Sequence, residues 1–156
     1  MLWVKTFFGI LFQTALLAIF LYLPALTLNW PDALLFLTVH FLITILASAY
    51  LLIVKPASIE ARMNYDSETQ PKEDRLATAL MFSAIIVGLS LAPIDIFHLN
   101  LSSSFESSIK NIGLAIYIIG MLLFMASINA NEFAETTVNI QEERGQKVID
   151  LSLIHI

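Results

Sequence analysis

The side chain best suited to chemistry inside an apolar stretch of this chain is His40. It lies about eight residues beyond Asp32, roughly 12 Å along a helix. Thr44 and Ser48 follow at intervals of four residues, so the three would share one helix face. A buried ionisable group in a membrane segment is a functional candidate. A proton relay would need an acid at similar depth, and the apolar stretches contain none, so the pattern favours hydrogen bonding between helices.

Two other groups carry weaker chemical signals. Asp95 and His98 could ligate a metal, but two candidate ligands without a third favour a helix-end and loop role. The serines at 102–104 lack a base and an orienting acid, which favours a solvated loop over a nucleophile. The chain has no cysteine, which excludes thiolate metal sites and a cysteine nucleophile. We therefore predict no metal site and no catalytic residue within these 156 residues.

The elements that must position these groups are helices in a membrane. Hydrophobic residues make up 58% of the chain, charged residues 13%, and the mean hydropathy is +0.79, far from the values of soluble domains. About 20 apolar residues in a helix cross the hydrocarbon core. The sequence predicts an all-α integral membrane bundle of four transmembrane helices with a short extended cytoplasmic tail. The predicted spans are about 6–29, 33–54, 76–94 and 111–130, with a polar connection before the third and a polar loop from Asp95 after it.

Small residues in the fourth span predict close packing against another helix, because they let backbones approach in lipid. They form two series, Gly113, Gly120 and Ser127 at heptad spacing, and Ala126, Ala130 and Ala134 in steps of four.

Orientation is predicted from the basic residues. If the four spans cross the membrane in alternating directions, Lys110 is the one basic residue on one side of the membrane. The basic residues on the other side are Lys5, Lys55, Arg62, Lys72, Arg75, Arg144 and Lys147. The positive-inside rule then places both termini in the cytoplasm. Nucleic acid is not an expected partner, because the basic residues are few and matched by acids.

Within the polar segment after the fourth span, residues 131–150, the stretch from Val138 to Ile149 predicts a short extended excursion at the cytoplasmic surface. Val138, Ile140 and Val148 are apolar among polar neighbours, and Gly145 supplies a turn between the halves.

This segment carries a resemblance to a known family. It reads Asn131-x-Phe133, then Val138-x-Ile140-Gln141-x-x-Arg144-Gly145-Gln146-x-Val148-Ile149. The pattern resembles the isoprenylcysteine carboxyl methyltransferase family and its phospholipid methyltransferase relatives. Two upstream parts resemble the family more loosely. One is Asp95, after the third span. The other is the connection between spans two and three, through Pro56, Glu60, Ala61, Arg62, Lys72, Glu73 and Asp74. The resemblance covers about residues 50–150.

The resemblance implies transfer of the methyl group of S-adenosylmethionine to a prenylcysteine carboxylate or a lipid acceptor. In the family, the motifs that hold this cofactor are an Arg-His-Pro-x-Tyr sequence and paired glutamates further on. They have no matching positions here and would lie beyond Asp150, so no cofactor-binding residue is carried over. The family pattern that precedes these cofactor motifs, here called the lead-in, is matched by Asn131, Gln141 and Arg144. We expect these residues to shape the excursion and the helix end. Direct contact to substrate or cofactor is the alternative.

The final residues suggest a truncated enzyme. Residues 151–156 read Leu-Ser-Leu-Ile-His-Ile, which is what a nucleotide string resembling a transposase adapter end would encode. We therefore expect residues 1–150 to be the N-terminal transmembrane part of a methyltransferase-like domain and 151–156 to be an adapter-derived artefact. The fragment is expected to be inactive and to bind no S-adenosylmethionine. Two alternatives stay open: a non-enzymatic four-span protein, such as a small transporter subunit or assembly partner, and a related membrane reductase.

Overall fold

The computed structural model describes residues 1–63, 72–101 and 107–130. Within this part, four helices are long and apolar enough to cross a membrane, and no strand occurs. They are α1 (Leu2–Ala25), α2 (Pro31–Val54), α4 (Lys72–Ile94) and α5 (Ser107–Ala130). The predicted all-α membrane bundle of four transmembrane helices is confirmed. The predicted extended tail belongs to residues 131–156 and lies outside the described residues.

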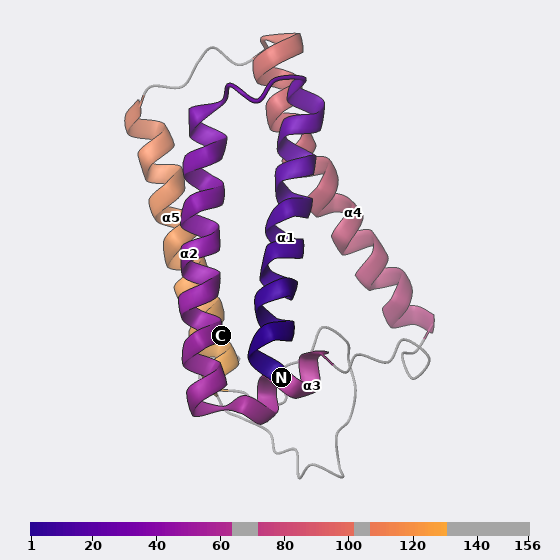
Figure 1. Cartoon of the computed structure of the whole chain (residues 1–156). Helices are drawn as coiled ribbons and strands as arrows, with labels where there is room; N and C mark the ends of the chain where they lie inside the picture. The colour runs from indigo at the N-terminus through magenta and orange to yellow at the C-terminus, as the bar shows by residue number, and fades with distance from the viewer. Residues whose placement is uncertain (64–71, 102–106, 131–156) are drawn as a thin grey trace, which may run out of the picture.

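Helices α1 and α2 form an antiparallel hairpin at the centre of the bundle (Figure 1). Helix α4 packs against α1 and diverges from it toward its own start, whereas α5 packs against α2. In the described part of the chain, α4 and α5 make no contact with each other. One end of the bundle, here named the α3 end, holds the start of α1, the ends of α2 and α5, and the short helix α3 (Pro56–Met63).

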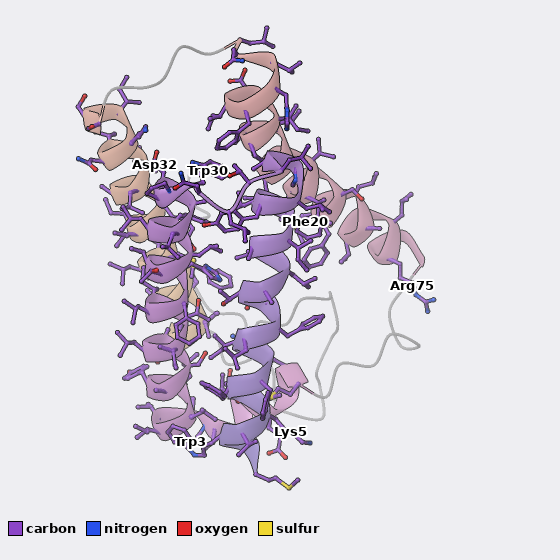
Figure 2. All side chains as sticks on the ribbon, turned by 45° about the horizontal axis from the view of Figure 1, so that its top comes forward. Trp3, Lys5, Phe20, Trp30, Asp32 and Arg75 are labelled. Carbon is purple, nitrogen blue, oxygen red and sulfur yellow. The ribbon has the colours of Figure 1, made fainter. Side chains whose placement is uncertain are left out.

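The turn between α1 and α2 lies at the opposite end. Leu26 adopts the left-handed conformation (φ 53°) and its N–H bonds to the carbonyls of Tyr22 and Leu23, which ends α1. Pro31 then occupies the first turn of α2, where no N–H is needed. Trp30 packs edge-on against Tyr22, with ring centroids 6.3 Å apart, and against Phe97 at 5.3 Å. Figure 2 shows Trp30 and Asp32 at this end and Trp3 and Lys5 at the α3 end.

Pro24 lies inside α1 and leaves the carbonyl of Phe20 without its helical N–H donor. The Ser90 hydroxyl of α4 donates to this carbonyl at 3.5 Å. In lipid, backbone groups must be satisfied within the protein. The proline therefore helps to determine where α4 meets α1 (Figure 2).

The sequence predicts a polar loop from Asp95 onward, and this prediction is wrong for residues 95–99, which are helical. A π-helix, η1 (Asp95–Leu99), continues directly from α4, with Pro93 fully buried inside the helix before it. The N–H of Asn100 bonds to the Asp95 carbonyl at 2.7 Å, and the N–H of Leu101 bonds to Asp95 Oδ1 at 2.8 Å. These bonds extend the helix past the proline and cap its end.

The polar connection predicted after α2 contains a short helix, α3 (Pro56–Met63). Lys55 ends α2, and α3 begins at once because Pro56 suits a first helical position. Ser58 and Ile59 are buried, whereas Glu60 is exposed. Ile59 packs with Leu51, Leu52 and Ile128 in an apolar cluster that closes the α3 end.

The small-residue prediction for the fourth span is also wrong in the described residues. Apart from the chain neighbours and the backbone of α5 itself, no atom lies within 4 Å of the position that a Cβ would take on Gly113 or Gly120, and Ser127 is exposed. Helix α5 instead meets the bundle through larger side chains, including Tyr117 and Ile128. Ala134 lies outside the described residues.

Candidate functional site

His40 forms a buried polar contact between two transmembrane helices. Its side chain is 5% exposed, and Nδ1 lies 2.5 Å from the hydroxyl of Tyr117 on α5. Phe36, one turn earlier, stacks on the imidazole with centroids 6.3 Å apart, and its ring lies 4.9 Å from that of Tyr117. The predicted hydrogen bonding of His40 between helices is confirmed. We name His40, Thr44 and Tyr117 the intramembrane site.

Tyr117 was missed by the sequence reasoning, although a signal existed. A tyrosine in the middle of an apolar span must find a partner for its hydroxyl when buried. The sequence shows that His40 and Tyr117 are both near the middle of their spans, but their separation of 77 residues leaves the pairing undetermined.

Thr44 does not make the predicted hydrogen bond within the bundle. Its Oγ1 is buried and has no hydrogen-bond partner among the described residues. The same is true of His40 Nε2, the second nitrogen of the imidazole. Ser48 is half-buried on the same helix. The predicted polar stripe therefore exists, but two of its buried polar atoms lack partners in the described part.

A second polar group, the α3-end cluster, consists of Lys55, Ser58, Arg62 and Asn129. Lys55 Nζ donates to the carbonyl of Asn129 in the last turn of α5, at 2.5 Å. A cation at this place is favourable because the final carbonyls of a helix lack helical donors and carry partial negative charge. Ser58 is 2% exposed, and Arg62, one turn later on α3, is half-buried.

The α3-end cluster combines groups that suit an anion. Two cations, a buried hydroxyl and an amide lie at or near helix ends, and the apolar cluster around Leu51 and Ile128 lies beside them. Carboxylate and phosphate groups are the usual partners of such cations. Within the described residues, Ser58 Oγ and the side-chain oxygen of Asn129 have no hydrogen-bond partner.

Asp95 and His98 make separate contacts. Asp95 Oδ1 caps the end of η1, and His98 Nε2 donates to the carbonyl of Pro24 in α1 at 2.7 Å. Asp95 therefore has the predicted helix-end role, whereas His98 lies within η1 and contacts α1. Among the described residues, no group of three or more potential metal ligands occurs. The serines at 102–104 lie outside the described part.

The lead-in positions Asn131, Gln141 and Arg144 also lie outside the described residues, so their predicted roles stay predictions. The structure does place Asn129, which precedes them in the chain, in the α3-end cluster.

The ion pair between Lys110 and Asp32 joins the starts of α5 and α2, with Nζ and Oδ2 at 2.6 Å. We expect Lys110→Met to lower the free energy of unfolding by less than about 1 kcal/mol, because both side chains are about half exposed and water screens the pair. Thermal unfolding in detergent measures this effect, with Asp32→Asn as the matched control. A loss of several kcal/mol would contradict the expectation.

Comparisons with models of known protein families, with curated proteins and with solved structures found no match to this chain. The composition and the four spanning helices define its class: it is an integral membrane protein with an all-helical transmembrane bundle.

Proposed function

We propose that residues 1–150 form the transmembrane part of an S-adenosylmethionine-dependent methyltransferase that acts on a prenylcysteine carboxylate or a lipid acceptor. The observation that carries this proposal is the sequence pattern from Asn131 to Ile149, which resembles the membrane methyltransferase family named above. Helix α5 leads directly into that pattern, and its last turn contacts Lys55 in the α3-end cluster.

We also propose that the α3 end faces the cytoplasm. Lys5, Lys55, Arg62 and Arg75 belong to the parts of α1, α2, α3 and α4 nearest this end, whereas Lys110 lies at the other. The positive-inside rule favours this orientation. It would place both chain termini in the cytoplasm.

The layout suits methyl transfer at a membrane surface. A sulfonium methyl group is already activated, so catalysis depends mainly on alignment of donor and acceptor and on exclusion of water. The soluble cofactor and an acceptor anchored in lipid would meet at the membrane interface. The four transmembrane helices would form the scaffold and the wall along which the acceptor enters.

The residues at the α3 end would serve the acceptor better than the cofactor. Lys55 and Arg62 suit a carboxylate or phosphate, and a positive sulfonium gains nothing from them. The one acid on α3, Glu60, is exposed and lies outside the cluster. The proposal assigns cofactor binding to sequence beyond Asp150, where the family resemblance places it.

The test is a methyl-transfer assay on the chain extended by the genomic sequence that follows the codon for Asp150. We expect labelled methyl groups from S-adenosylmethionine to appear in a prenylcysteine acceptor or in a lipid extract. The chain ending at residue 150 is the matched control and should form no labelled product. Absence of product in every fraction from the extended chain would overturn the proposal. A genomic stop codon directly after residue 156 would refute the expected truncation.

A further inference from the structure

We propose that the intramembrane site binds the hydroxyl group of a single-chain lipid alcohol, with the alkyl chain lying along the seam between α2 and α5. This inference is independent of methyl transfer, because the intramembrane site lies inside the bundle and away from the α3 end.

The first argument is the hydrogen-bonding capacity left at His40 and Thr44. The Tyr117 hydroxyl has no acceptor other than His40 Nδ1 in the described part, so we infer that it donates to Nδ1. The neutral imidazole then carries its proton on Nε2, which has no acceptor there. Thr44 Oγ1, one turn along the same helix, is also buried without a partner. A hydroxyl oxygen can accept from Nε2 and exchange a second hydrogen bond with Thr44.

The second argument is depth. His40 lies about 13 Å from the start of α2 at roughly 1.5 Å per residue, near the middle of this 24-residue helix. Bulk water is absent at that depth, and a polar atom without a partner is costly there. A ligand that reaches the intramembrane site from the bilayer must therefore be mostly apolar and carry one hydrogen-bonding group.

The third argument is space beside Tyr117. Gly113 and Gly120 lie one turn before and one turn after it on α5, and residues so spaced are neighbours on a helix surface. Apart from the chain neighbours and the α5 backbone, nothing lies within 4 Å of the position of an added Cβ at either glycine. The backbone on both sides of the tyrosine is thus open to an approaching alkyl chain. Phe36, which stacks on His40 and contacts Tyr117, provides an apolar surface at the same place.

The experiment uses the chain of residues 1–156 in phosphatidylcholine nanodiscs and a hexadecanol carrying a diazirine for photo-crosslinking. The matched probe is the same diazirine hydrocarbon without the hydroxyl. We expect the alcohol to label the chain about fivefold more than the hydrocarbon, the size of effect that one hydrogen bond provides. Thr44→Val should reduce labelling by the alcohol, because one of the two hydrogen bonds is lost, and should leave labelling by the hydrocarbon unchanged. Tyr117→Phe should also reduce it, because the imidazole loses the bond that orients it.

Thr38→Val is the matched control. Thr38 lies on the same helix, but it is exposed and its hydroxyl is already bonded to the Leu34 carbonyl at 2.8 Å. Labelling of this variant should equal that of the unaltered chain. Nitrogen NMR of His40 provides a second readout, in which hexadecanol should shift the Nε2 resonance and hexadecane should not.

Two outcomes would overturn the proposal. One is equal labelling by the two probes, or equal labelling of the Thr44→Val and Thr38→Val variants. The other is an Nε2 resonance that reports a bound water only and does not respond to hexadecanol. Neither the crosslinking nor the NMR measurement depends on methyl-transfer activity. A negative result would therefore overturn the lipid-alcohol site without bearing on the proposed methyl transfer.

Discussion

A cysteine replacing Glu60 should react with a membrane-impermeant maleimide only after the cytoplasmic side is opened, whereas a cysteine replacing Leu101 should react in intact cells. The chain has no cysteine of its own, so each variant carries a single thiol. Glu60 is exposed on α3, and Leu101 is 81% exposed just after η1 at the other end of the bundle. The expected difference is close to all or none, because a bilayer separates the two positions.

The matched control for this labelling is Leu46→Cys. Leu46 is 69% exposed near the middle of the transmembrane helix α2, where it faces lipid. Its thiol should react in neither condition, since the reactive thiolate does not form in hydrocarbon. Labelling of Glu60→Cys in intact cells, with protection of Leu101→Cys, would reverse the proposed orientation. Labelling of Leu46→Cys in intact cells would contradict the membrane assignment of α2.

Leu51→Ala should lower the free energy of unfolding by about 2–5 kcal/mol, the range for truncation of a buried leucine. Leu51 is 2% exposed and packs with Leu52, Ile59 and Ile128, so its removal leaves a cavity where α2, α3 and α5 meet. Packing contacts matter in a membrane protein because lipid provides little hydrophobic force between helices. Unfolding by a denaturing detergent, followed by circular dichroism, measures the loss.

Leu46→Ala is the matched control for the cavity. It removes the same atoms from the same helix, but Leu46 faces lipid, which fills the space left behind. We expect a change below about 1 kcal/mol, as for exposed substitutions. Equal losses in the two variants would mean that the apolar cluster at the α3 end does not stabilise the bundle.

The α3 end holds Lys55, Arg62 and the entry to residues 131–150, and it is closed by the apolar cluster around Leu51. If this end faces the cytoplasm and is rigid, the α3-end cluster holds its cations at a fixed place at the membrane interface. The proposed methyl transfer requires both properties.

The sequence by itself determined the class of this protein and the approximate limits of its four transmembrane helices. The physical reason is that lipid offers no partners to backbone N–H and C=O groups, so an apolar run of sufficient length must be helical. The turn at Trp30-Pro31-Asp32 could be predicted for an equally local reason, since Pro31 suits a helix start. The candidate residues Asn131, Gln141 and Arg144 stay predictions.

Only the tertiary structure decided which side chains meet. An apolar helix face gains little hydrophobic free energy when it moves from lipid to a protein neighbour. Composition therefore does not reveal which face of a helix packs against another helix. The pairing of His40 with Tyr117, the open surroundings of Gly113 and Gly120, and the bond from Ser90 to the carbonyl freed by Pro24 all depend on the relative placement of distant helices. So does the α3-end cluster, in which Lys55 reaches the last turn of α5 across 74 residues of sequence.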